Sequence, residues 1–265
     1  MRILVVIRHV PDSRAAVTVL PDGSGVEHKG LKFVCNPFDE FAVEQATRLK
    51  ESRSDIDEIV VACVGPAEAE PSIRAALAIG GDRAVHIRSD DSMPAHDDLA
   101  AARALSLWMQ GNSDVQFDLI LCGKQAIDTD VCDFGPAFAE YLDLPHVGAI
   151  VGFELSDDGQ QVTVRRRVGG AEEVVAMGLP CLATCDRGLN EPRNTPLPKV
   201  MQARKKPLES VRAGDIAGLS DWKAGTAFVQ LSPPAEKEPC TVIEGEPEEM
   251  ARELVRVLRE EAKVI

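Results

Sequence analysis

The chain has 265 residues, of which 45% are hydrophobic, so it can bury a substantial core and a disordered protein is excluded. Asp and Glu outnumber Lys and Arg by 43 to 29, and the formal charge of -14 argues against binding to nucleic acid or to an anionic membrane. The apolar run after Met1 ends at Arg8 and His9, which is too short for a signal peptide or a membrane span, so we expect a cytoplasmic protein without membrane insertion.

Up to about residue 150, short runs rich in β-branched residues alternate with stretches of helical periodicity. This alternation is typical of a parallel sheet covered by helices. Asn36 and Pro37 form the N-cap and the first residue of a predicted helix that runs to about Arg53. The expected strands are residues 2–7, 58–64, 84–87, 118–122 and 147–153, and the further expected helices are residues 67–79, 97–110 and 133–141.

Two hairpins are expected outside the parallel sheet. Residues 16–20 and 25–27 flank the turn signal at residues 21–24, and residues 161–168 and 173–176 form a more polar, antiparallel pair. The sequence therefore predicts an α/β fold, with a Rossmann-like, doubly wound, mostly parallel sheet to which an antiparallel ribbon is added.

The character of the chain changes at Asp186, because prolines then fall among charged residues with little periodicity. This composition predicts an extended arm along the surface. Apolar residues between Met250 and Leu258 recur at the spacing of one helix face and predict an amphipathic last helix, which needs an apolar surface to dock on. We therefore expect two parts, an α/β domain over residues 1–185 and an arm with a terminal helix over residues 186–265.

Metal and catalytic sites find little support in the sequence. The seven cysteines include no Cys-x-x-Cys pair and the five histidines are scattered, so no metal centre is predicted. Neither a GxGxxG nor a GxxxxGK[ST] loop occurs, which argues against an NAD-type cofactor and against ATP hydrolysis. Acidic pairs such as Glu172 and Glu173 are typical of solvated faces, so no catalytic residue is predicted.

The loop over residues 123–136 carries the most distinctive chemistry, because ligands of an open parallel sheet bind beyond the carboxyl ends of its strands. The loop leaves a buried strand at Gly123 and enters a helix whose free N–H groups are able to bind a phosphate. Asp128, Asp130 and Asp133 would repel that phosphate, and their other roles are to cap the helix or to bind a ribose hydroxyl. From the residues alone, a nucleotide site and a helix-capping loop both stay open.

Six stretches in the same order resemble the signature of electron transfer flavoprotein β subunits, and they cover nearly the whole chain. They are NPFD at 36–39, AALAIGGDR at 75–83, GKQAID at 123–128, VRRRVGGAEE at 164–173, LNEPR at 189–193 and LPKVMQARKKP at 197–207. The resemblance implies a sheet of the adenine nucleotide α-hydrolase-like kind. It also implies an electron carrier with no catalysis of its own, which works with an α subunit that holds most of a shared FAD.

The resemblance further implies an AMP with a structural role inside this chain. The residues that it assigns to the nucleotide are Val6, Asn36, Pro37, Phe38, Asp39, Val64, Gly123, Gln125, Ala126, Ile127, Asp128, Thr129, Asp130, Val131, Cys132, Asp133, Phe134, Gly135 and Pro136. Phe38 has a second candidate role near the flavin ring, and its alternative role is to anchor its own helix in the core.

Two further partners follow from the resemblance. The α subunit is expected to dock on the arm and the last helix, and acyl-CoA dehydrogenases or related flavin dehydrogenases are expected to receive Leu197, which prolines flank on both sides. The sequence departs from the family at Ser13 and Asn194, where tyrosine is common, and at Arg167, where some relatives carry an acid. These departures concern the packing of the flavin and of the partner's flavin domain.

Two alternative functions stay open. A bifurcating subgroup of the family holds a second FAD in place of AMP, but residues 96–102 offer carboxylates and few hydroxyl donors to its diphosphate, so AMP is favoured. A stand-alone nucleotide-binding regulator is the alternative of another class. Such a regulator has no evident need for the long segment after Asp186.

Overall fold

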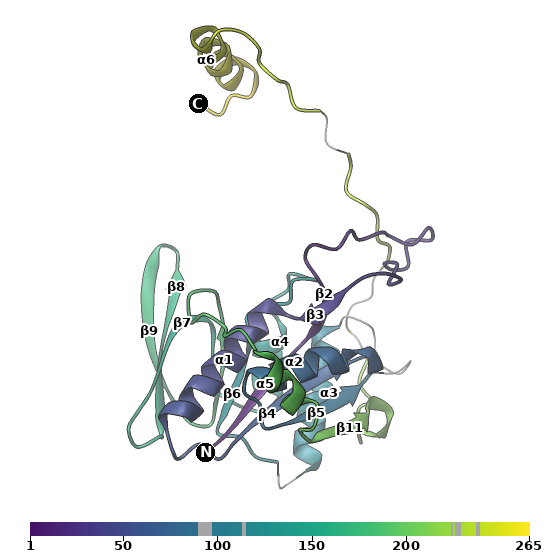
Figure 1. The fold of residues 1–265 in the computed structure, drawn as a ribbon, viewed down its shortest axis with the longest axis vertical. Helices are drawn as coiled ribbons and strands as arrows, with labels where there is room; N and C mark the ends of the chain where they lie inside the picture. The colour runs from purple at the N-terminus through teal and green to yellow at the C-terminus, as the bar shows by residue number, and fades with distance from the viewer. Residues whose placement is uncertain (90–96, 113–114, 224, 226–228, 237–238) are drawn as a thin grey trace.

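The computed structural model describes residues 1–265 except 90–96, 113–114, 224, 226–228 and 237–238 (Figure 1). The strands are β1 (Arg2–Ile7), β2 (His9–Pro11), β3 (Phe33–Cys35), β4 (Glu58–Gly65), β5 (Arg83–Arg88), β6 (Leu119–Gly123), β7 (His146–Leu155), β8 (Gln161–Val168), β9 (Ala171–Gly178), β10 (Cys181–Cys185) and β11 (Leu208–Arg212). Within the described residues, nine of them form one sheet in the order β11-β5-β4-β1-β6-β10-β7-β8-β9. The strands from β11 to β7 run parallel and β8 and β9 are antiparallel, so the expected fold class is confirmed.

Helices cover both faces of this sheet. The helical elements among the described residues are α1 (Pro37–Ser52), η1 (Ala67–Ala69), α2 (Glu70–Ile79), α3 (Asp98–Gly111), α4 (Phe134–Tyr141), α5 (Leu197–Ala203), η2 (Ala213–Asp215), α6 (Pro247–Arg256) and η3 (Val257–Glu261), of which α6 and η3 lie away from the sheet. The face with Ile3 and Val5 packs against α1 and α2, and the face with Leu4 and Val6 packs against α3 and α4. Successive side chains of a strand point to opposite faces, so the unbroken apolar run of β1 supplies both cores.

The order in which strands are added to the sheet reverses at β1. The chain builds β4 and β5 outward on one side of β1, and then returns to place β6 on the other side, with Val5 of β1 paired to Val61 and to Leu121. The carboxyl ends of β1 and β6 therefore form a topological switch point, which is where an open α/β sheet leaves room for a ligand.

The sequence pattern did not indicate β10, although this strand lies between β6 and β7 and all of its residues are buried. It has only five residues, it follows Pro180 directly, and Cys181, Ala183 and Cys185 take places where a parallel strand more often has branched aliphatic residues. Burial on both faces decides its structure, and a short run shows that burial weakly.

Residues 12–32 leave the sheet as a separate excursion, which contains the expected hairpin. Val19 and Val26 form an antiparallel bridge around the predicted turn. The structure adds a second pair, because β2 and β3 run antiparallel at the base of the excursion. There the His9 ring stacks on the Phe33 ring at a centroid distance of 4.7 Å.

The segment after Asp186 differs from the extended arm that the sequence indicated. It forms α5 and then β11, which pairs in parallel with β5 and becomes one edge of the sheet. Ile216 and Leu219 also pack into the core beside α3 and α4, so the extended arm begins only after about residue 219. The sequence did not indicate α5 because prolines lie on both sides of it. It did not indicate β11 because this edge strand has exposed polar side chains. The functional division at residue 185 stays a prediction.

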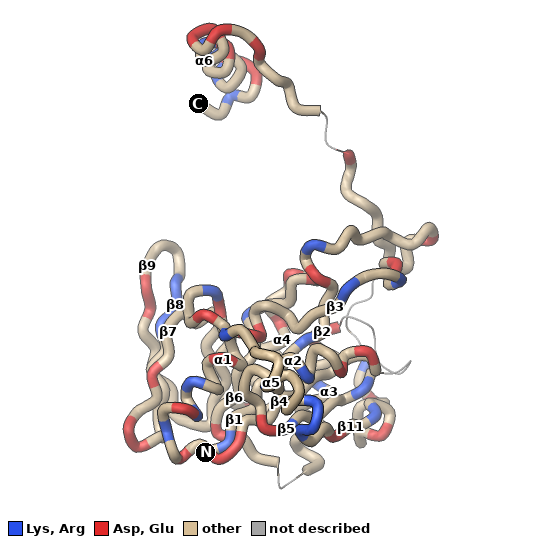
Figure 2. Tube along the Cα trace, in the orientation of Figure 1, with Lys and Arg blue, Asp and Glu red and all other residues tan. Residues whose placement is uncertain are grey.

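The chain ends in the expected helix, formed by α6 and η3, which buries none of its residues. In Figure 1 this helix stands away from the sheet at the end of the extended arm. No helix among the described residues is both long enough and apolar enough to cross a membrane. Figure 2 shows acidic and basic residues interspersed along the described part of the trace.

Candidate functional site

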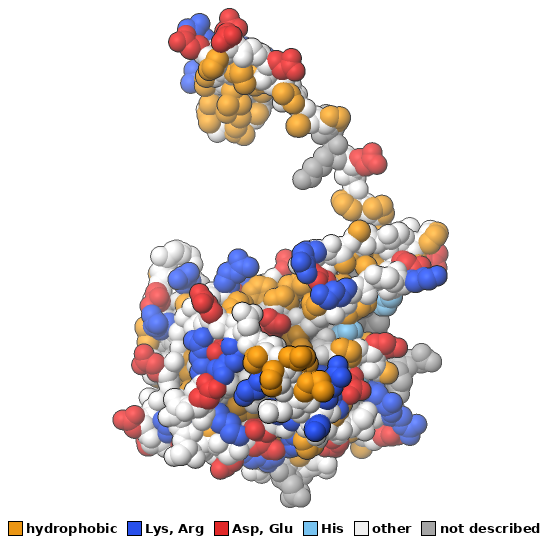
Figure 3. All heavy atoms as spheres, in the orientation of Figure 1, with side chains coloured by type: hydrophobic (Ala, Val, Ile, Leu, Met, Phe, Trp, Pro, Cys, Tyr) orange, Lys and Arg blue, Asp and Glu red, His pale blue; other side chains and the backbone are white. Residues whose placement is uncertain are grey.

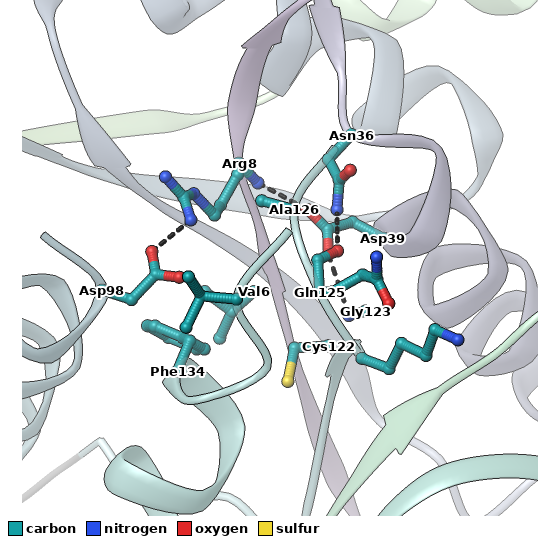
Figure 4. Close-up of a pocket in the computed structure, with 12 residues that line it drawn as sticks. Val6, Arg8, Asn36, Asp39, Asp98, Cys122, Gly123, Gln125, Ala126 and Phe134 are labelled. Carbon is teal, nitrogen blue, oxygen red and sulfur yellow. Dashed lines mark hydrogen bonds and ion pairs between the residues drawn. The ribbon is translucent and has the colours of Figure 1, made fainter. Parts of the chain in front are cut away.

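A small pocket lies beyond the carboxyl ends of β1 and β6 (Figure 4). About 280 Å³ of empty space lies between its walls, open solvent included. The two strands, the loop after β6 and the first turns of α1, α3 and α4 supply its walls. The lining residues are Val6, Arg8, Asn36, Asp39, Asp98, Cys122, Gly123, Lys124, Gln125, Ala126, Val131 and Phe134.

Asn36 joins the start of α1 to the loop after β6. Its buried side chain donates from Nδ2 to the Gln125 carbonyl at 2.9 Å and accepts at Oδ1 from the Ile127 N–H at 3.3 Å. Asn36 takes the N-cap position of α1 as expected, but its side chain does not cap the first N–H groups of that helix. Its amide instead fixes the path of the loop across the pocket.

Asp39 ties the ends of β1 and β6 together. Its Oδ2 accepts from the Arg8 N–H at 2.6 Å, and its Oδ1 accepts from the Gly123 N–H at 2.8 Å. Burial raises the pKa of Asp39 to about 7, and the two backbone donors oppose that rise. Glycine is needed at position 123, because a Cβ there would lie 2.7 Å from the Phe38 Cβ and closer still to Asp39.

Arg8 lies between two carboxylates on one side of the pocket, and Figure 4 shows its pairing with Asp98. Its guanidinium pairs with Asp98, the first residue of α3, and lies 3.5 Å from Oδ2 of Asp128. Burial raises the pKa of Asp98 to about 6; Arg8 opposes the rise, and the nearby Asp133 and Asp128 add to it. One guanidinium therefore serves two carboxyl groups, those of Asp98 and Asp128.

The loop over residues 124–133 folds back on itself. The Asp130 N–H donates to the Ala126 carbonyl at 2.9 Å, and the Asp130 carboxylate accepts from Gln125 Nε2. Asp130 has a φ of 57°, a left-handed conformation that aspartate tolerates better than most residues. The exposed thiol of Cys132 lies 3.8 Å from Gln125 Oε1. Loop geometry thus accounts for most of these polar side chains without a ligand.

Phe38 lies beside Lys124, which leaves the pocket toward β10. The Lys124 ammonium is 3.1 Å from Asp186 Oδ2 and 5.2 Å from the centre of the Phe38 ring. Phe38 also makes an edge contact with Phe41, with ring centres 6.4 Å apart. Phe38 is half-buried and belongs to neither core cluster, so its role as a core anchor and its role near a flavin both stay predictions.

Comparison with known proteins places the chain in a family. Residues 25–216 match the family described as Electron transfer flavoprotein domain. A protein of Bacillus subtilis (strain 168) named electron transfer flavoprotein subunit beta is 36% identical over 266 residues, which covers 100% of both chains. The chain belongs to the electron transfer flavoprotein β-subunit family. Proteins of the same name from Sus scrofa and Homo sapiens are 36% and 38% identical, and the alignments cover 100% and 82% of this chain and 99% and 83% of those relatives.

The pocket collects part of the nucleotide site that the family resemblance implied. The assigned residues that line it are Val6, Asn36, Asp39, Gly123, Gln125, Ala126, Val131 and Phe134. The assigned residues that lie outside its lining are Pro37, Phe38, Val64, Ile127, Asp128, Thr129, Asp130, Cys132, Asp133, Gly135 and Pro136. The binding role of each residue stays a prediction.

Four lining residues were not assigned from the sequence: Arg8, Asp98, Cys122 and Lys124. Cys122 and Lys124 flank Gly123, and Arg8 directly follows β1. Ligands of an open parallel sheet bind beyond the carboxyl ends of its strands, and this rule was sufficient to find these three residues. Asp98 reaches the pocket from the first residue of α3, 90 residues away from Arg8. No local pattern signals that contact.

Leu197 is exposed at the first position of α5, where 72% of the residue's surface is accessible. Met201, one turn later, is 50% accessible. Figure 3 shows hydrophobic side chains gathered over α5 with basic side chains beside them. The outward presentation expected for Leu197 is therefore present, and its partner stays a prediction.

An ion-pair network holds the segment before α5 against α1. The Arg193 guanidinium donates to Glu44 at 2.8 and 3.2 Å and to Glu51 at 2.6 and 2.8 Å. Asn190 donates to the Phe41 carbonyl at 3.0 Å. These bonds attach the chain to α1 at Arg193, four residues before the exposed Leu197.

Proposed function

We propose that this chain is the β subunit of an electron carrier, which works with an α subunit and takes electrons from acyl-CoA dehydrogenases or related flavin dehydrogenases. Family membership over the whole chain is the observation that carries the proposal. FAD, shared with the α subunit, supplies the redox chemistry when it is bound. The part of this chain is to hold the partner subunit, to present Leu197 to the donor and to keep the sheet rigid.

We propose AMP as the ligand of the pocket. Val6, Ala126 and Phe134 provide apolar walls of the kind that hold a base or a ribose, and Gln125 provides amide groups. The first N–H groups of α4 have no acceptor within that helix, and with Arg8 they form an anion-binding end. The residues therefore fit a nucleoside with an anionic group, although three carboxylates oppose that group.

A second FAD in place of AMP finds less support. Its additional diphosphate would need donors at the start of α3, where the Asp97 side chain already caps Ala100 at 2.9 Å and Asp98 pairs with Arg8. His96, which belongs to the same stretch, lies outside the described residues. Carboxylates at the start of α3 disfavour the diphosphate of a second FAD and therefore favour the smaller anion, the phosphate of AMP.

A stand-alone regulator fits the C-terminal part poorly. The helix α6 leaves Leu254 and Val255 exposed, and 48% of the first and 44% of the second is accessible. Isolated helices with an apolar face are stabilised mainly by packing against a partner. We infer that the α subunit covers this face.

The nucleotide content of the α/β complex separates these functions. We expect one FAD and one AMP per complex when both are released by denaturation and measured by chromatography. Two FAD molecules and no AMP would establish the bifurcating alternative. A complex with AMP and no FAD would instead favour a regulator.

We expect Leu197→Ala to slow electron transfer from a cognate reduced dehydrogenase by about tenfold to a hundredfold at limiting carrier concentration. Burying one leucine contributes roughly 1.5–3 kcal/mol to an interface, which corresponds to that range. The exposed Val174 offers a matched control, because it is 64% accessible and lies on β9, at the opposite edge of the sheet from β11, the strand that follows α5.

The readout is the transfer rate from the dehydrogenase compared with chemical reduction by dithionite. The anchoring role requires that Leu197→Ala slow only the first reaction and that Val174→Ala slow neither. An equal loss in both reactions would show that Leu197 acts on the flavin or on folding, and it would refute the role as an anchor.

A further inference from the structure

The helix that carries Leu197, α5, is too short to fix its own orientation. It has seven residues, whereas isolated helices shorter than about 12–15 residues are only marginally stable in water. Ala203 belongs to the buried core and Val200 packs against that core, next to α2, on which α5 lies (Figure 1). Leu197 and Met201 are exposed on the outer side. Contacts from outside α5 must therefore hold these two side chains in a defined direction.

Arg74 of α2 binds the carbonyl end of α5. Its Nη1 donates to the Ala203 carbonyl at 3.0 Å and to the Lys206 carbonyl at 2.7 Å. Its Nε donates to the Glu70 carboxylate at 3.1 Å, and 22% of the Arg74 side chain is accessible. The last carbonyl groups of a helix have no partner within that helix and attract cations. Arg74 therefore fixes the end of α5 at a point that α2 determines.

Lys206, which closely follows α5, makes the reciprocal contact with the end of α2. Its ammonium donates to the Leu77 carbonyl at 2.8 Å and to the Gly81 carbonyl at 2.5 Å. Leu77 lies in the last turn of α2, and Gly81 comes just after that helix. Each segment thus supplies a cation to the carbonyl end of the other. We call Arg74 and Lys206, with these four hydrogen bonds, the α2–α5 clasp.

We propose that Arg74 and Lys206 are positioning residues for the docking of the dehydrogenase, because the clasp sets the direction in which Leu197 and Met201 are presented. The inference rests on the docking role proposed above for Leu197. Arg193 attaches the chain to α1 before α5, and the clasp attaches it to α2 after α5. Without the second attachment, α5 samples several orientations. The dehydrogenase then binds only the fraction of molecules in the competent orientation, which lowers its apparent affinity by that fraction.

We expect Arg74→Met to raise the KM for the α/β complex by about fivefold to tenfold in its reduction by a cognate acyl-CoA dehydrogenase, as for a competent fraction of about a tenth to a fifth. The rise should be smaller than the effect of Leu197→Ala, because a correctly oriented leucine is still present in part of the molecules. The kcat at saturating complex and the rate of reduction by dithionite should hardly change, since Arg74 belongs to α2 and contacts only Glu70 and the end of α5 in the bonds described above.

Arg53→Met is the matched control for a general loss of stability. Arg53 also donates to two backbone carbonyls, those of Ser156 at 2.9 Å and Asp157 at 3.0 Å, in the turn between β7 and β8. It also binds an acidic side chain, that of Asp55, and 19% of it is accessible. Both variants should lower the thermal midpoint of the complex, but only Arg74→Met should raise the KM. Equal rises in KM would show that Arg74 acts on stability alone and would overturn the inference.

A double-mutant cycle shows whether Arg74 acts through Leu197. Effects of independent residues add as free energies, whereas effects that pass through one shared contact do not. The complex with both Arg74→Met and Leu197→Ala should therefore have nearly the KM of Leu197→Ala alone. A KM raised by the product of the two separate effects would show that Arg74 acts independently of Leu197, which would contradict the role of the clasp.

Two further variants keep the test decisive if Arg74→Met does not assemble with the α subunit. Arg74→Lys keeps the cation but loses the planar guanidinium, and Lys206→Met breaks the other half of the clasp. Each should raise the KM in the same direction. An unchanged KM in the variants that assemble, while Leu197→Ala raises it, would overturn the clasp and keep the docking role. An unchanged KM in Leu197→Ala would refute the docking role itself.

Discussion

Gly123→Val is expected to destabilise the α/β complex by roughly 3 kcal/mol or more, the sum of overpacking and of a lost buried hydrogen bond. A Cβ at this position would lie 2.7 Å from the Phe38 Cβ and 2.8 Å from the Phe38 carbonyl carbon, and it would also displace the Asp39 carboxylate. The backbone carbon cannot move unless α1 moves with it. The Gly123 N–H bond to Asp39 would be lost as well.

The measurement is the thermal midpoint of the complex with and without added AMP. A change of 1 kcal/mol shifts the midpoint by about 2–4 °C in a chain of this size, so we expect a fall of about 6–12 °C. The stabilisation by AMP, which follows from binding to the native state alone, should disappear. Gly178→Val is the control, because nothing lies within 4 Å of a Cβ at that strand position. A fall no larger than that of the control would contradict the role of Gly123.

Arg193→Met is expected to destabilise the complex by about 2–3 kcal/mol and to weaken docking of the dehydrogenase as well. The substitution leaves the side chain of Glu44, only 2% accessible, with Arg48 as its single cationic partner. Breaking a buried pair costs more than the pair contributes, because the remaining charge stays desolvated. The expected loss of stability is small for a broken buried ion pair, because Arg193 is partly exposed and Glu44 keeps its contact with Arg48.

Arg212→Met provides the matched control. Arg212 binds Asp215 through two hydrogen bonds of 2.8 and 2.9 Å, but both side chains are more than half exposed. Exposed pairs contribute roughly 0–1 kcal/mol, so its midpoint should hardly change. Similar shifts in the two variants would show that the Arg193 network does not hold the segment in place.

This network also has a pH dependence with a defined sign. Burial acts to raise the pKa of Glu44, but the Arg193 and Arg48 guanidinium groups more than offset it, so the pKa lies below its usual value of 4.5. A lowered folded-state pKa contributes stability above the unfolded pKa, and this contribution is lost as the pH falls through the folded value. The difference between wild type and Arg193→Met should therefore shrink below about pH 4.5.

Local patterns were sufficient for most of the sheet and its helices. Strands such as β1, β4 and β6 are unbroken apolar runs because helices bury both of their faces, and that property is visible in the sequence. The strands that escaped prediction are β10, which is short and rich in cysteine, and β11, which is a polar edge strand directly after Pro207. Both are strands because of the strands beside them, β6 and β7 for β10 and β5 for β11, and not because of their own composition.

The site was predictable in place but not in its contacts. The position beyond β1 and β6 follows from topology, and Asn36 and Gln125 follow from the family resemblance. The use of Asn36 as a bridge instead of a helix cap depends on a loop 89 residues away. The pairing of Arg8 with Asp98 depends likewise on how α3 meets β1, which no local pattern encodes.

The central claim is that this chain carries a flavin only together with its partner subunit. The most direct test is the visible spectrum and the FAD content of the purified chain alone, compared with the co-expressed α/β complex. We expect a colourless and aggregation-prone isolated chain, because α6 and α5 expose apolar side chains, and a yellow complex with one FAD per heterodimer. A monomeric isolated chain that holds stoichiometric FAD would contradict the claim.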